Sequence, residues 1–165
     1  MRTFLVLAIA AAVALVLQTT ILQALPYVSV VPDVLLILCV YLGLYHHSAG
    51  GALGAFMLGY LEDSVSGSAA GLNAFALCLI FLLIYLTSRR LWVENVVSQV
   101  VVVFLAALVK AAAVTALLAI FASFQRGWSL VLGSLVLQGL LTAAVAPLVF
   151  ALLKRTRRAS DAHAE

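Results

Sequence analysis

Residues 34–63 read VLLILCVYLGLYHHSAGGALGAFMLGYLED, two apolar runs separated by a polar His-His-Ser turn at 46–48. The first run covers 34–45 and the second covers 49–61, so they contain 12 and 13 residues. Because an α-helix rises 1.5 Å per residue, each run reaches only about 20 Å of a ~30 Å hydrocarbon layer. The stretch predicts either two thin membrane crossings extended by their flanks or one re-entrant hairpin.

The rest of the chain is as apolar as this stretch. Of its 165 residues, 66% are hydrophobic and 9% are charged, whereas soluble domains carry roughly 25% charged residues. A water-facing surface needs more charge than nine basic and six acidic residues supply. The composition excludes a soluble globular protein and indicates an integral membrane protein.

Four more apolar segments lie on either side of residues 34–61, at 4–17, 72–86, 96–124 and 130–153. The first lacks the small residues of a signal-peptide cleavage site, so we expect it to be retained as a crossing. Pro147 predicts a kink in the last segment. We predict an all-α integral membrane protein, a compact bundle of about six transmembrane helices formed by residues 1–153. We expect residues 154–165 to form a basic, disordered cytoplasmic tail.

The basic residues predict the orientation of the bundle. With six crossings and a cytoplasmic N-terminus, Arg126 alone lies outside, Lys110 stays in the membrane and all others lie inside, as the positive-inside rule expects. An alternative stays open, in which residues 34–61 form a single element instead of two crossings. The N-terminus then lies outside. The net charge of +3 comes largely from the tail, so we expect contact with anionic lipid or cytoplasmic protein rather than nucleic acid. The residues expected to make this contact are Arg89, Arg90, Lys154, Arg155, Arg157 and Arg158, and Arg2 lies on the same side.

Lys110 lies near the centre of the 96–124 segment, where a charge is expensive in lipid. Its stem is too short to bring the ammonium group easily to the interface. One interpretation is that it binds a carboxylate on a partner or substrate. The other is an internal ion pair with Asp33, Glu62 or Asp63 that holds the bundle together.

The acidic residues also allow two interpretations. Glu62 and Asp63 end the second run before a small-residue loop at 64–68, and two buried carboxylates could form a proton or cation site. Alternatively, one caps or packs near a helix end while the other faces water. Asp33 follows Pro32 and is placed to cap the next helix. Neutral polar residues predict interhelical hydrogen bonds; they are Asn73, Gln99, Gln138, Thr115 and Thr142.

Small residues repeat at a spacing of four in the second run. The pairs are Gly50 with Gly54 and Ala55 with Gly59. Small side chains let helix backbones approach closely, and such packing is a main source of attraction between helices in lipid. We predict that this helix packs tightly against a neighbour in this chain or in a partner.

The sequence lacks the motifs of most enzymes. It has no phosphate loop, no dinucleotide fingerprint, no nucleophile–base set and no zinc-protease motif. The adjacent His46 and His47 do not face each other on a helix, and Cys39 and Cys78 are isolated apolar-segment cysteines. We therefore expect no catalytic residue, no cofactor and no metal site.

Three motifs together resemble a known family. They are Pro32-Asp33 before an apolar helix, the glycine-rich stretch 50–63 ending in Asp63, and Gly71-Leu72-Asn73 opening the next segment. In these motifs and in its length, its apolar segments and its basic tail, the chain resembles the rod-shape-determining MreD family of the bacterial cell-elongation machinery. We expect Gly71 to be a packing residue, like the small residues of the 49–61 run.

The resemblance implies a non-enzymatic, multi-pass inner-membrane subunit of the elongasome, with both termini cytoplasmic, that maintains cell shape and lateral peptidoglycan synthesis. It implies an MreC-like periplasmic scaffold, an MreB-like filament and the wall-synthesis polymerase and transpeptidase as partners. It also implies a fold similar to the substrate-binding subunits of energy-coupling-factor transporters. That similarity frames an alternative, a vitamin-binding transporter subunit with Lys110, Asn73 and Glu62 in its pocket. Short outer loops with few aromatic side chains favour the scaffold role.

Overall fold

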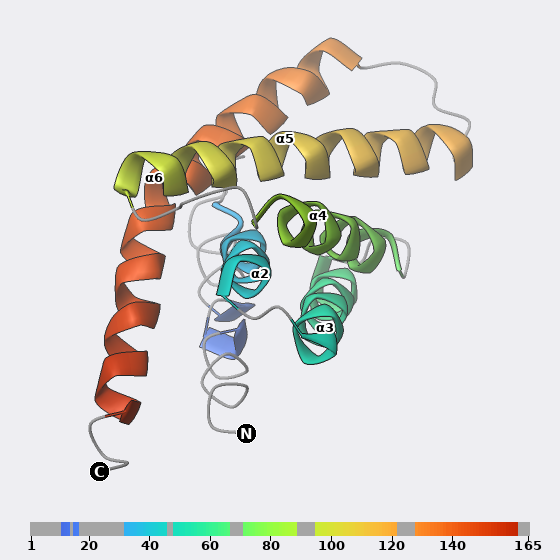
Figure 1. Cartoon of the computed structure of the whole chain (residues 1–165). Helices are drawn as coiled ribbons and strands as arrows, with labels where there is room; N and C mark the ends of the chain where they lie inside the picture. Colours follow the sequence, from blue (N-terminus) through green and yellow to red (C-terminus); the bar gives the residue numbers. More distant parts are fainter. Residues whose placement is uncertain are drawn as a thin grey trace.

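The computed structural model describes residues 11–13, 15–16, 32–45, 48–66, 71–88, 95–121 and 128–161. Only the backbone is described at 118–121, 128–135, 154 and 156–161. Each regular element in these ranges is a helix, which confirms the all-α prediction for the described residues. The helices are α2 (Val34–Tyr45), α3 (Ala49–Ser66), α4 (Leu72–Ser88), α5 (Val96–Phe121) and α6 (Trp128–Asp161), shown in Figure 1. Most of the predicted segment at 4–17 lies outside the described residues.

Helix α2 is the centre of the bundle. It is apolar on all sides, and its residues from Leu35 to Gly43 are all buried. A helix with no polar face has to be surrounded by other elements or by lipid. Here α2 packs against α3, α4, α5 and α6, with α3 and α4 on one side and α5 crossing the bundle (Figure 1).

Helix α3 is longer than the sequence predicted. It was expected to end at Glu62 and Asp63 and to be followed by a loop at 64–68, but the helix continues through Ser66. The Ser64 hydroxyl donates a hydrogen bond to the Tyr60 carbonyl at 2.9 Å, so this serine is accommodated within the helix. The loop prediction was therefore wrong for residues 64–66.

Helix α6 also extends beyond its predicted end. The backbone stays helical past Leu153 to Asp161, a region that we expected to be a disordered tail. The helix contains Pro147 and changes direction along its length in Figure 1. Proline lacks an N–H and its ring crowds the carbonyl four residues earlier, which accounts for a bend in a long helix.

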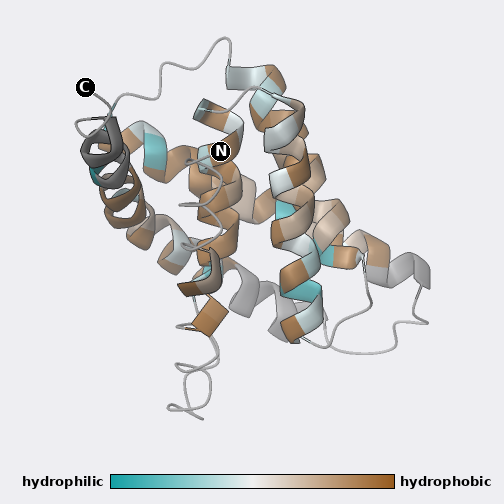
Figure 2. Ribbon diagram, turned by 90° about the horizontal axis from the view of Figure 1, so that it is seen from below, coloured by the Kyte–Doolittle hydropathy of each residue, from teal (hydrophilic) through white to brown (hydrophobic). Residues whose placement is uncertain are grey.

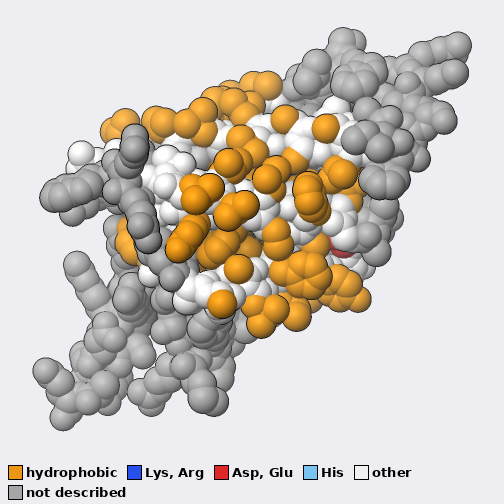
Figure 3. Space-filling view, turned by 45° about the vertical axis from the view of Figure 1, so that its right-hand side comes forward, with side chains coloured by type: hydrophobic (Ala, Val, Ile, Leu, Met, Phe, Trp, Pro, Cys, Tyr) orange, Lys and Arg blue, Asp and Glu red, His pale blue; other side chains and the backbone are white. Residues whose placement is uncertain are grey.

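The outside of the described bundle is strongly apolar. Figure 2 shows that hydrophobic residues dominate the helices, and Figure 3 shows a face on which hydrophobic side chains gather. Large apolar side chains point outward from α3, α4, α5 and α6, for example Val97 on α5, which is 73% exposed. Water would disfavour such a surface, whereas lipid would not. The surface is consistent with a membrane protein.

Two segments of the described chain are long and apolar enough to cross a bilayer, Val96–Leu117 in α5 and Val136–Leu153 in α6. Helices α2 and α4 are apolar but shorter. The structure therefore supports two of the six predicted crossings by length and composition.

Candidate functional site

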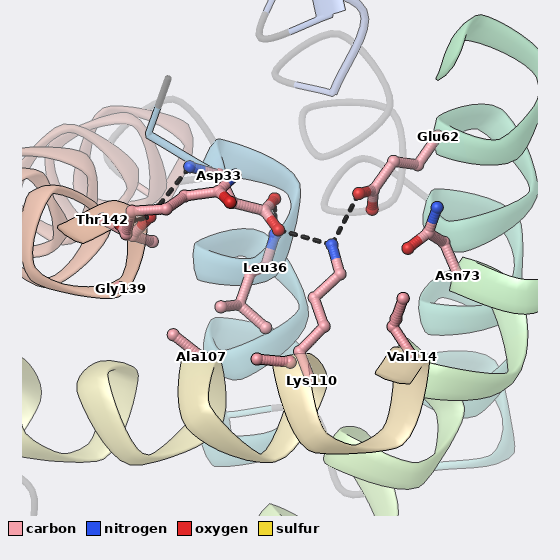
Figure 4. Close-up of a pocket in the computed structure, with 11 residues that line it drawn as sticks. Asp33, Leu36, Glu62, Asn73, Ala107, Lys110, Val114, Gly139 and Thr142 are labelled. Atoms are coloured by element: carbon pink, nitrogen blue, oxygen red, sulfur yellow. Dashed lines mark hydrogen bonds and ion pairs between the residues drawn. The ribbon is translucent and has the colours of Figure 1, made fainter. Parts of the chain in front are cut away.

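Lys110 lies on α5 with its side chain pointing into the bundle (Figure 4). Its ammonium group pairs with Asp33 Oδ2 and with Glu62 Oε1, the latter at 2.6 Å. The Lys110 and Asp33 side chains are each 10% exposed, so these charges are largely withdrawn from solvent. Of the two interpretations of Lys110, the structure shows the internal ion pair, with Asp33 and Glu62 as the partners.

Asp33 joins three helices at the start of α2. Its Oδ1 accepts the Leu36 N–H at 2.9 Å, which is the predicted helix cap. Its own N–H donates to Thr142 Oγ1 on α6 at 2.9 Å, and the Thr142 hydroxyl donates to the Gln138 carbonyl at 2.7 Å. With the ion pair to Lys110, Asp33 connects α2, α5 and α6.

Glu62 points from α3 toward Lys110 rather than toward water (Figure 4). One carboxylate oxygen pairs with Lys110, while the other, Oε2, is buried without a hydrogen-bond partner among the described residues. Glu62 also lines a cavity of about 170 Å³. The cavity lining comprises Asp33, Leu36, Glu62, Asn73, Ala107, Lys110, Ala111, Val114, Gln138, Gly139 and Thr142.

Asp63 is adjacent to Glu62 in sequence, but its carboxylate bonds to a different part of the fold. Its Oδ2 accepts the Gly71 N–H at 2.9 Å and the Ala74 N–H at 3.2 Å, and its Oδ1 accepts the Asn73 N–H at 3.0 Å. These donors belong to the first turn of α4, whose N–H groups have no partner within the helix. Asp63 therefore caps α4 from the end of α3, and the two carboxylates do not form one shared proton or cation site.

The small residues of α3 pack within this chain. A Cβ added at Gly59 would lie 2.3 Å from the Cα of Ala74 on α4, and Ala55 is fully buried. A Cβ at Gly54 would lie 3.2 Å from Leu42 Cδ1 on α2. Gly50 is half-buried. Gly54 thus packs against α2 and Gly59 against α4. Both neighbours belong to this chain, which is one of the two possibilities that the sequence left open.

Gly71 does not have the packing role that we predicted for it. Nothing lies within 4 Å of a Cβ added there, but its φ is +96°. Residues with a side chain rarely adopt that backbone conformation, so glycine is needed for the turn into α4. Its contribution is conformational, and it places its own N–H on Asp63.

Sequence reasoning missed two further glycine contacts, a close one at Gly43 and an ordinary van der Waals contact at Gly139. A Cβ at Gly43 on α2 would lie 2.9 Å from Ile84 Cγ2 on α4, and one at Gly139 on α6 would lie 3.4 Å from Ala107 Cβ on α5. The buried Cys39 thiol donates to the Leu77 carbonyl at 3.2 Å. An isolated glycine in an apolar helix was the only available signal for the first two contacts.

The predicted lipid-contact residues are only partly described. Arg155 is exposed, whereas Arg89 and Arg90 lie outside the described residues. Lys154, Arg157 and Arg158 have a helical backbone, but their side chains are not described. Their contact with lipid or cytoplasmic protein stays a prediction.

The geometry favours a structural role for the buried charges. Lys110 is shared by two carboxylates, and Asp33 and Asp63 each accept N–H groups at the start of a helix. No three His, Cys, Asp or Glu side chains of the described chain lie together as a metal site requires. The cavity is also smaller than the roughly 300–1,000 Å³ of typical small-molecule pockets.

Fold and site together define a class of protein, an apolar helical bundle whose buried ion pairs and caps tie its helices to one another. The chain belongs to the family described as rod shape-determining protein MreD, whose family model matches residues 1–156. This confirms the resemblance seen in the sequence and makes the chain a rod-shape-determining protein. Comparisons with curated proteins and with solved structures give no significant match.

Proposed function

We propose that the chain is a non-catalytic subunit of the cell-elongation complex in the bacterial inner membrane. In this role it maintains cell shape and lateral peptidoglycan synthesis by binding partner membrane proteins. The observation that carries the proposal is the family match over residues 1–156. The apolar outer surface of the described bundle and the structural use of its buried charges support it.

The proposed arrangement has about six membrane crossings with both termini in the cytoplasm. Residues 1–153 are the membrane domain, and the basic residues that follow meet anionic lipid or cytoplasmic protein. Each basic residue near an anionic surface contributes about 1 kcal/mol of attraction. The bundle would then share its general fold with the substrate-binding subunits of energy-coupling-factor transporters.

The outer apolar faces are the proposed docking surfaces. Gly54 and Gly59 face α2 and α4, so they contribute to docking indirectly, by holding α3 in place. The opposite side of α3 exposes Leu53, Phe56 and Tyr60 at helical spacing. Helices associate in lipid through such close side-chain packing.

The proposed partners are an MreC-like periplasmic scaffold, an MreB-like filament and the wall-synthesis polymerase and transpeptidase. No observation on the described residues favours the transporter alternative, since the cavity beside Lys110 is small and its charges pair internally. We propose no cofactor.

Affinity purification tests the proposal. The tagged chain, extracted from membranes of a rod-shaped host, should co-purify with the MreC-like scaffold. Replacing Phe56 and Tyr60, both exposed, by Ala should reduce the recovered scaffold without lowering the level of the chain. Recovery of the chain without the scaffold, under conditions that keep other membrane complexes intact, would contradict the docking role.

A further inference from the structure

The cavity beside Lys110 has an imbalance of charge among the described residues. One amino group, that of Lys110, pairs with two carboxyl groups, those of Asp33 and Glu62. Asp33 is additionally stabilised by the Leu36 N–H at the start of α2. The nearby Asp63 is stabilised by three N–H groups at the start of α4. Glu62 is therefore the carboxylate with the least compensation.

One carboxylate oxygen of Glu62 also lacks a hydrogen-bond partner in the described part of the chain. Oε2 is buried and has no hydrogen-bond partner among the described residues. A buried carboxylate oxygen without a partner is unfavourable, and a charge-assisted hydrogen bond is the interaction that would satisfy it best. Glu62 lines the cavity and its side chain as a whole is 21% exposed, whereas Oε2 itself is buried, so a group that bonds to this oxygen has to enter the cavity.

The shape and lining of the cavity indicate what kind of cation fits. Its volume is about 170 Å³, and Leu36, Ala107 and Val114 are apolar parts of its lining. Figure 4 shows Glu62 and Asn73 on one side of Lys110, with Val114 below them on α5. The described residues hold no group of three His, Cys, Asp or Glu side chains that could bind a metal ion. An alkylammonium or alkylguanidinium group has a charged end for the carboxylate and methylenes for the apolar wall.

We infer that this cavity receives a Lys or Arg side chain from a membrane segment of a partner protein, with Glu62 Oε2 accepting its charge. The inference rests on the proposed docking function and specifies the chemistry of the partner. The incoming charge neutralises the cluster of Lys110, Asp33 and Glu62 when the complex forms. Without the partner, the cluster retains an unpaired carboxylate oxygen.

The first test uses the purified full-length protein in detergent with butylammonium chloride as the probe. We expect butylammonium to raise the thermal unfolding midpoint of the wild type above the value in sodium chloride at equal ionic strength. Glu62→Gln should lose this difference, and Glu62→Asp, which keeps the charge, should keep part of it. Equal responses of the wild type and Glu62→Gln, or no response of either, would overturn the inference.

The second test locates the partner in cells. A photo-crosslinking amino acid at Val114, which lines the cavity, should give an adduct with a partner segment that contains Lys or Arg. Glu62→Gln should lower this adduct several-fold, whereas an adduct from the exposed Leu108 should not depend on Glu62. Glu62→Asp, which keeps the charge, should restore part of the Val114 adduct.

An adduct that is unchanged in Glu62→Gln, or that maps to a segment without a basic residue, would contradict the inference. If the scaffold does not co-purify with the wild-type chain, that result would instead contradict the proposed function. The two failures are distinguishable, because co-purification can persist in Glu62→Gln through the apolar faces of the bundle.

Discussion

Lys110 shows how one buried charge organises several helices. It comes from α5 and pairs with Asp33 at the start of α2 and with Glu62 on α3. Asp33 in turn is joined to Thr142 on α6. Removing one member of such a cluster leaves the others buried and unpaired, which costs more than the cluster contributes when intact.

Lys110→Ala should therefore lower the free energy of unfolding by about 3–5 kcal/mol. A variant that combines Lys110→Met with Asp33→Asn and Glu62→Gln should recover much of that loss, because no unpaired charge remains. Asn also preserves a cap at the start of α2. Unfolding in detergent, followed by circular dichroism, measures both effects. A triple variant less stable than Lys110→Ala would show that the charges themselves hold the bundle.

Asp63 gives a second prediction at the residue scale. Its carboxylate accepts three N–H groups of the α4 start, so Asp63→Ala should destabilise the fold by about 1–3 kcal/mol. Asp63→Asn keeps one acceptor oxygen and should lie between Ala and the wild type. Thermal midpoints of the three proteins give the order directly, and equal midpoints for Ala and Asn would argue against capping.

Part of this site could be predicted from the residues. Lys110 is an intramembrane cation in a chain with only six acidic residues, so an internal pair was one of two available interpretations. The cap by Asp33 depends only on local sequence. Glu62 pairs with Lys110, whereas Asp63 caps α4. This difference was not predictable, because it depends on where α4 begins in space relative to the end of α3.

At the scale of helices, the approach of α3 to α4 depends on a single missing side chain. Gly59 lies so close to Ala74 that the contact is backbone to backbone. Gly54 meets only the end of the Leu42 side chain, which can move. The two glycines look alike in sequence, yet the structure gives them different tolerance.

Gly59→Ala should destabilise the bundle by about 1–3 kcal/mol or more, because the backbones of α3 and α4 have to separate. Gly54→Ala, the matched control on the same helix, should have a small effect. Thermal unfolding and the level of protein in the membrane measure the difference. Similar losses in both variants would contradict the close contact at Gly59.

Element boundaries were predictable where hydropathy changes sharply. Helix α2 covers the 34–45 run as expected. The ends of α3 and α6 were not predictable from hydropathy. Their polar residues stay helical, through Ser66 in α3 and through Asp161 in α6. In α3 the polar residues bond to neighbouring elements and to the helix itself, which hydropathy cannot reveal.

At the scale of the whole molecule, the described bundle is tied internally by its charges and apolar on its outside. This is the reverse of a soluble protein with a charged surface, and it suits a subunit that meets lipid and other membrane helices. The apolar composition predicted this surface. The match to the MreD family over residues 1–156 then gives it a role in rod shape.

Cell shape after depletion of the chain in a rod-shaped host is the most direct measurement of this account. We predict that the length-to-width ratio falls toward that of a sphere, that expression of the wild type restores it, and that Gly59→Leu does not. Cells that stay rod-shaped after complete depletion but then require an external vitamin would contradict the account.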